Sequence, residues 1–105
     1  MGQRAIRHPR QKELHEALGR VIVTGRKVRR MSREALAERA GVSELALRDW
    51  ENGRPQPLGG LMLVADVFKV PLANLFVAAD RALAVRDRAT PSPDGRRKDG
   101  EALFG

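Results

Sequence analysis

Two short amphipathic segments separated by a single glycine constrain this chain more than any other feature. They lie between Met31 and Gly53 and read MSREALAERAGVSELALRDWENG. Ser32 and Ser43 stand where helix N-caps are favoured, one before each segment. Gly41 lies between them and tolerates the positive φ that often follows a helix end. The sequence therefore predicts two short helices that meet at a sharp glycine turn.

The apolar residues of this segment repeat at helical spacing and indicate which side of the pair is buried. The predicted buried residues are Leu36, Ala37, Ala40, Val42, Ala46, Leu47 and Trp50. Ala37 is small because two helices that cross near a right angle approach closely at that point. The other side of the second helix and its flank carry Glu44, Leu45, Arg48 and Asp49.

The segment resembles the Cro/repressor-type (XRE-family) helix-turn-helix of bacterial and phage regulators. Ala37, the turn glycine Gly41 and the closing Trp-Glu-Asn-Gly of residues 50–53 carry the resemblance, which extends to 18–30 and 58–76. It implies an all-α fold, a compact five-helix lambda-repressor-like bundle whose third helix lies in the DNA major groove. The alternative is an ordinary helical hairpin, but the matches on both flanks favour the family.

Residues 21–28, VIVTGRKV, allow two interpretations. β-Branched residues and an interior glycine, which costs about 1 kcal/mol relative to alanine in a helix, favour a strand and turn. We predict a helix, because an apolar stripe at three- and four-residue spacing continues through this run and Pro9 suits the first turn. The stripe consists of Leu14, Ala17, Leu18, Val21, Ile22, Gly25 and Val28.

After Gly53 the sequence predicts a rigid loop over 54–57 and two further helices. Helical character resumes at Leu58, but Gly59 and Gly60 occupy the expected start of the first of these helices, so we expect that helix to begin later. Its predicted core residues are Leu61, Val64, Ala65 and Phe68. Pro71 begins the last helix, in which Leu72, Leu75 and Phe76 close the bundle and which extends towards Arg88.

These elements divide the chain into three parts. Residues 1–9 form a flexible basic arm, residues 10–80 the helix-turn-helix domain with its motif at 32–53, and residues 81–105 a helical extension followed by a disordered tail. The chain contains no cysteine, so disulfides and thiolate metal sites are excluded. It has no apolar run that would span a membrane and no secretion signal, so we expect a cytoplasmic protein.

The net charge of +7 is concentrated at one end of the chain. Residues 1–30 carry nine Lys or Arg and two Glu, whereas residues 31–58 carry four Lys or Arg and five acidic residues. A polyanion is the partner that this distribution favours. The predicted motif itself is slightly acidic, so affinity for DNA has to come from the arm and the first helix.

The family resemblance implies which residues contact double-stranded DNA. The candidates for base contact are Ser43, Glu44, Leu45, Arg48 and Asp49. The candidates for phosphate contact are Arg33, Asn52 and Arg54, joined by the arm residues Arg4, Arg7 and Arg10. The resemblance also implies a structural ion pair between Arg26 and Glu51, which ties the first helix to the recognition helix.

The predicted function is that of a sequence-specific transcriptional regulator, a repressor that binds a palindromic operator as a homodimer. Leu63, Val77 and Leu83 are candidates for the dimer contact or for an enlarged core. The alternative is a protein-interaction module on the same fold, such as an antitoxin that binds a toxin or a transcription cofactor. We expect no enzyme, cofactor or metal site, because His8 and His15 lack a convincing carboxylate cluster and no phosphate-binding glycine loop is present.

Overall fold

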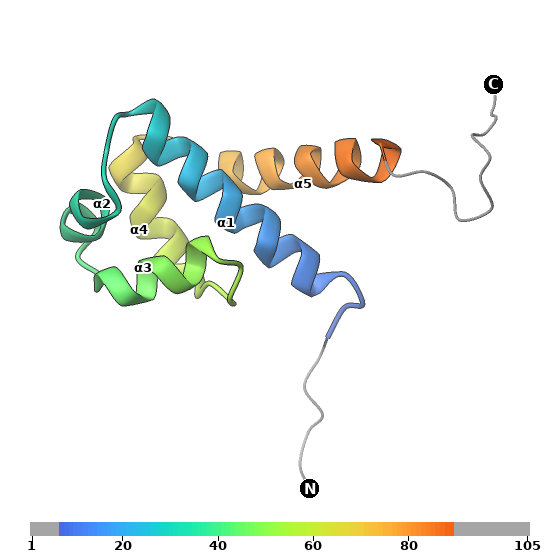
Figure 1. The fold of residues 1–105 in the computed structure, drawn as a ribbon, viewed down its shortest axis with the longest axis horizontal. Helices are drawn as coiled ribbons and strands as arrows, with labels where there is room; N and C mark the ends of the chain where they lie inside the picture. The colour runs from blue at the N-terminus through green and yellow to red at the C-terminus, as the bar shows by residue number, and fades with distance from the viewer. Residues whose placement is uncertain (1–6, 90–105) are drawn as a thin grey trace, which may run out of the picture.

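Helix α1 crosses the molecule and packs against three of the other helices (Figure 1). The computed structural model describes residues 7–89, and its helices are α1 (Gln11–Val28), α2 (Arg33–Ala40), α3 (Glu44–Glu51), α4 (Leu58–Phe68) and α5 (Leu72–Ala89). Helix α5 lies along α1, and α2 packs on α3 and α4. The predicted all-α, five-helix architecture is confirmed for the described residues.

Residues 21–28 belong to α1, so the helical interpretation of this run is right. Close packing explains the glycine at position 25 of this helix, because a Cβ atom there would lie 2.9 Å from Cζ of Phe68. Two details of the prediction are wrong. Pro9 stands in a turn before α1, and Val28 is 68% exposed because it is the last residue of α1, where the chain turns towards α2.

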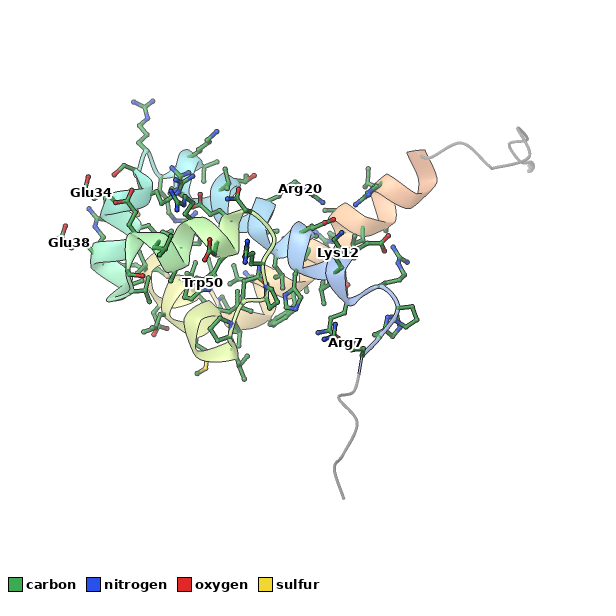
Figure 2. The ribbon with its side chains drawn as sticks, turned by 60° about the horizontal axis from the view of Figure 1, so that its bottom comes forward. Arg7, Lys12, Arg20, Glu34, Glu38 and Trp50 are labelled. Carbon is green, nitrogen blue, oxygen red and sulfur yellow. The ribbon has the colours of Figure 1, made fainter. Side chains whose placement is uncertain are left out.

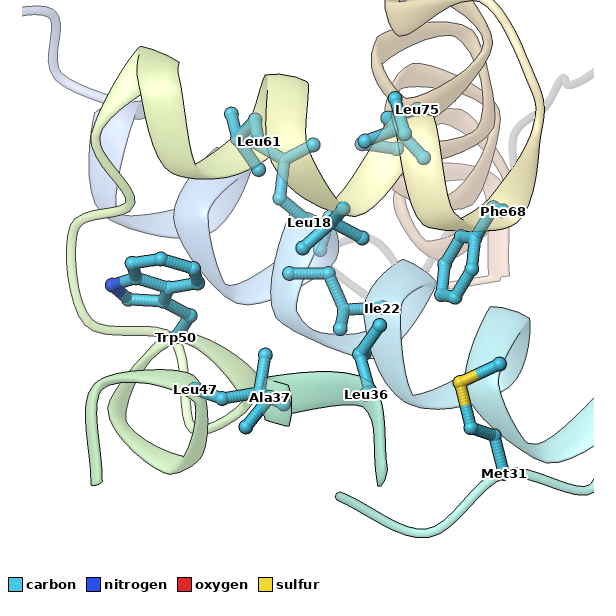
Figure 3. Packing of buried hydrophobic residues seen from close by; sticks show 14 residues of the cluster. Leu18, Ile22, Met31, Leu36, Ala37, Leu47, Trp50, Leu61, Phe68 and Leu75 are labelled. Atoms are coloured by element: carbon cyan, nitrogen blue, oxygen red, sulfur yellow. The ribbon is translucent and has the colours of Figure 1, made fainter. Parts of the chain in front are cut away.

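The hydrophobic core forms around α1. Figure 3 shows Leu18 and Ile22 between side chains of α2 and α3 on one side and of α4 and α5 on the other. Full burial of a leucine or isoleucine contributes about 1.5–3 kcal/mol, so each of these two side chains adds substantially to stability. The buried apolar residues include Leu36, Ala37, Leu47, Trp50, Leu61, Val64, Ala65, Phe68, Leu75 and Ala79.

Helix α4 begins at Leu58, so the expected late start is wrong. Gly59 and Gly60 lie in its first turn, and the amide of Leu61 already donates to the carbonyl of Pro57 at 3.1 Å. Gly60 is buried against the indole ring of Trp50. Close packing therefore explains one of the two glycines, and the helix tolerates both.

Helix α5 starts one residue after Pro71 and runs to Ala89. Leu75 is buried and Leu83 packs at the edge of the core, whereas Leu63 of α4 and Val77 are exposed. The predicted tail from residue 90 and the arm up to residue 6 lie outside the described residues.

Arg29 joins the C-terminal ends of α1 and α4. Its Nη1 donates to the carbonyl of Gly25 at 2.8 Å and its Nη2 to that of Phe68 at 3.1 Å, while the guanidinium lies 4.4 Å from the centroid of the Phe68 ring.

Within residues 7–89 no single helix is long and apolar enough to cross a membrane. Helices α4 and α5 meet that test only as a pair, which is bent by 101°.

Candidate nucleic-acid interface

Helices α2 and α3 begin and meet as their sequence predicts. The hydroxyl of Ser32 accepts from the amide of Ala35, and that of Ser43 from the amide of Ala46, each at 3.0 Å. Gly41 adopts φ +76° at the end of α2, a left-handed conformation that disfavours residues with a Cβ. Both caps and the turn are therefore confirmed, and together they set the angle at which α3 leaves α2.

Helix α3 has one buried and one exposed side. Leu47 and Trp50 lie in the core, which anchors the helix against α1 and α4. The opposite side exposes Ser43, Glu44, Leu45 and Arg48, with Asp49 half-buried at its flank. Leu45 is 58% exposed and belongs to no part of the core. The base-contact candidates thus form one accessible row on a rigidly held helix.

The carboxylate of Glu51, with a side chain only 2% exposed, accepts from two arginines at the C-terminal end of α3. Arg26 of α1 donates from Nε to Oε2 at 2.8 Å and from Nη2 to Oε1 at 3.1 Å. Arg33 of α2 donates from Nε to Oε1 at 3.0 Å. The structure thus brings Arg26 and Glu51 together as the resemblance implies, and adds Arg33, which sequence reasoning had assigned only to phosphate.

A shallow cleft separates the start of α2 from the exposed side of α3. Its volume is about 280 Å³, and it is lined by Arg33, Glu44, Leu45 and Arg48. Two guanidinium groups and one carboxylate give its walls a net charge of +1. The cleft therefore joins one phosphate-contact candidate to three base-contact candidates.

The remaining phosphate-contact candidates lie in two places. Asn52 and Arg54 are exposed immediately after α3. Arg7 and Arg10 are exposed before α1, where Arg10 donates from Nε to Glu13 at 2.7 Å. Arg4 lies outside the described residues.

A second hollow connects these two places. It has a volume of about 510 Å³ and is lined by Arg7, His8, Pro9, Gln11, Lys12, His15, Gly53 and Pro55. Figure 2 shows Arg7 and Lys12 on one side of Trp50 and α3, with Glu34 and Glu38 of α2 on the other. Sequence reasoning missed Lys12, for which the only signal was the basic charge of residues 1–30.

The loop after α3 is held by Gln56, a buried polar residue that sequence reasoning also missed. Its Nε2 donates to the carbonyl of His15 at 2.8 Å and to that of Trp50 at 3.0 Å. Its Oε1 lies 2.6 Å from Nδ1 of His15, which donates when that nitrogen carries the proton. These bonds keep the loop against the first turns of α1.

Among the described residues, no three His, Cys, Asp or Glu side chains are grouped to hold a metal ion.

Comparisons with known proteins agree with this geometry. Residues 26–75 match the family model described as Helix-turn-helix. A crystal structure of the clp gene regulator ClgR from Corynebacterium glutamicum is 27% identical, with a TM-score of 0.66 over 70% of this chain and 80% of the regulator's. A second structure of that regulator is 27% identical, with a TM-score of 0.63 over 69% and 95% of the two chains. No curated protein sequence matches the chain significantly.

Proposed function

We propose that this chain is a DNA-binding transcriptional regulator of the Cro/repressor type, a repressor that recognises a palindromic operator as a homodimer. The match of residues 26–75 to the helix-turn-helix family model and the similarity to the clp gene regulator support this proposal. The observation that carries the proposal is the accessible row on α3, held from behind by Leu47 and Trp50. A helix exposed in this way fits the major groove, which is wide enough to admit an α-helix. The similarity to a regulator of clp genes supports a role in transcription without specifying the genes controlled by this chain.

Each exposed side chain of α3 has a chemistry that suits a base edge. Glu44 accepts from N4 of cytosine, Leu45 packs on the methyl group of thymine, and Arg48 donates to guanine. Ser43 and Asp49 lie at the ends of the same row. A good base contact discriminates against the wrong base by about 1–3 kcal/mol, so a few of them account for sequence preference.

Affinity in this proposal comes mainly from residues outside α3. Glu44 and Asp49 repel phosphates, whereas Arg7 and Lys12 line a hollow with Gly53, directly after α3. Contacts to phosphate position a protein on the duplex without reading its sequence. Asn52, Arg54, Arg33 and the arm residues Arg4, Arg7 and Arg10 complete the proposed phosphate contacts. The protein then acts by binding DNA in the cytoplasm, without catalysis.

A homodimer follows from the size of the domain and the symmetry of a palindrome. One such domain reads a half-site, and two half-sites on one face of the duplex lie about 34–36 Å apart from centre to centre. The exposed side chains of Leu63 and Val77 are the apolar candidates for the contact between copies. Leu83 contributes less, because it already packs against the core.

Random-site selection followed by footprinting tests the proposal. The parent protein is expected to enrich one palindromic sequence, and Glu44→Gln and Arg48→Ala are expected to change the preferred bases. Arg39→Ala is the matched control, since Arg39 is exposed at the end of α2 and outside both hollows. Uniformly weaker binding by the Glu44 and Arg48 variants would show that these residues position the protein and do not read bases.

The acidic side of α2 and α3 favours one alternative function. Glu34 and Glu38 are exposed on α2, and Glu44 is exposed beside Leu45 on α3, a combination that also suits a protein partner such as a toxin or another transcription factor. A pure protein-binding module would enrich no duplex in the selection. That outcome would refute the proposed repressor and favour the protein-binding module.

A further inference from the structure

Glu51 accepts from two arginines although one positive charge already neutralises it. Arg26 is fully engaged, because its Nη1 also reaches the carbonyl of Met31 at 3.2 Å and its side chain is 13% exposed. Arg33 makes one bond, from Nε, and its side chain is 34% exposed. The second positive charge of the cluster therefore lies on Arg33, at the surface.

The two Nη groups of Arg33 have no hydrogen-bond partner within the described part of the chain. Arg33 is also the first residue of α2 and lines the 280 Å³ cleft together with Arg48. The positive end of the α2 dipole and the net positive charge of the cleft both favour an anion there. The Glu51 carboxylate, which is itself held by Arg26, limits the orientations that the Arg33 guanidinium can take.

We propose that Glu51 is a positioning residue that presents the free Nη groups of Arg33 to one phosphodiester group of the DNA backbone. This inference rests on the proposed DNA binding. A guanidinium can donate from Nε to one acceptor while its Nη atoms face another, and its planar fork matches the oxygens of a phosphate. A lysine retains the positive charge, but it lacks the planar fork that lets Nε bond Glu51 while both Nη atoms face a phosphate.

Substitutions of Arg33 separate charge from orientation. Binding to the selected duplex is measured at several salt concentrations for the parent, Arg33→Ala and Arg33→Lys, with Arg39→Ala and Arg39→Lys as controls. Arg33→Ala is expected to weaken binding about tenfold and to reduce the slope of log K against log salt by about 0.9, as for one lost phosphate contact. Arg33→Lys is expected to recover less than half of the lost binding free energy. The affinities of the Arg39 controls are expected to stay within about twofold of the parent affinity. The melting temperature of the Arg33 variants stays near the parent value, because Arg26 still neutralises Glu51.

A double-mutant cycle tests the role of Glu51 directly. Glu51→Gln is expected to weaken DNA binding in the parent and to add little in the Arg33→Ala background. If Glu51→Gln does not fold, the Arg33→Lys result decides alone.

Four outcomes would count against the proposal. If Arg33→Lys binds as tightly as the parent, the orientation set by Glu51 is irrelevant. A changed base preference in Arg33→Ala would assign Arg33 to a base, and equal effects of Glu51→Gln in both backgrounds would reduce Glu51 to a purely structural role. A parent protein that selects no duplex refutes the proposed function itself, whereas the first three outcomes leave that function intact.

Discussion

At the scale of single residues, partners far apart in the sequence determine what a side chain does. Glu51 contacts Arg26, which precedes it by 25 residues, and Gln56 contacts His15, which precedes it by 41. The family resemblance implied the first pair. No local pattern indicated the second, because a glutamine in a proline-flanked loop is usually exposed, and only packing of the loop against α1 buries it.

The Arg26–Glu51 pair is predicted to be a major contributor to stability. Glu51→Ala is expected to lower the free energy of unfolding by about 3–5 kcal/mol, because it strands the largely buried guanidinium of Arg26. Arg26→Ala is expected to lower it by less, because Arg33 still donates to the Glu51 carboxylate. Urea unfolding and thermal melts measure this loss. Arg10→Ala is the control, since the Arg10–Glu13 ion pair is exposed and such pairs contribute about 0–1 kcal/mol. Melts of the Arg26 and Glu51 variants that match the parent would mean that the two charges act independently.

At the scale of elements, helical periodicity predicted which segments are helices, and packing decided where some of them begin. The apolar stripe of α1 was sufficient to reject a strand over residues 21–28. The start of α4 was misjudged because glycine has a low helix propensity, whereas Gly60 is required by the ring of Trp50. Helix propensity depends on the local sequence and does not account for a side chain that packs from another helix.

The two adjacent glycines of α4 give a matched pair of substitutions. Gly59→Ala is expected to stabilise the protein by about 0.4–1 kcal/mol, because its Cβ meets nothing within 4 Å and alanine favours the helix. Gly60→Ala is expected to destabilise it by about 1–3 kcal/mol, because its Cβ would lie 2.9 Å from two atoms of the Trp50 ring. Chemical denaturation of both variants provides the measurement. Two substitutions with the same sign would contradict the packing explanation.

At the scale of the whole molecule, folding distributes the basic charge of residues 1–30 over more than one surface. The start of α1 lies beside the loop that follows α3, so Arg7 and Lys12 line a hollow together with Gly53 and Pro55. Arg20 instead lines a groove between α1 and α5. Only part of the basic charge of residues 1–30 is therefore placed to attract DNA to the proposed interface.

Deletion of residues 2–10 tests the contribution of the arm. The slope of log K against log salt is expected to fall by about 0.9 for each phosphate contact that is lost, so binding becomes less sensitive to salt. Arg20→Ala is the control and should leave the slope unchanged, because Arg20 lies on the α5 side of α1. Melting of the deletion variant without DNA checks that the fold persists. An unchanged slope would exclude the arm from the interface.

The sequence by itself determined the helix-turn-helix. Ser32, Gly41 and Ser43 act through hydrogen bonds and backbone conformations that span a few consecutive residues, and the apolar spacing of α1 to α5 selects their buried faces. The tertiary structure alone decided that Arg33 joins Glu51, that Gln56 holds the loop to α1, and that Lys12 lies beside the loop after α3. Local interactions can be recognised from neighbouring residues, whereas these contacts depend on the angles at which whole helices pack.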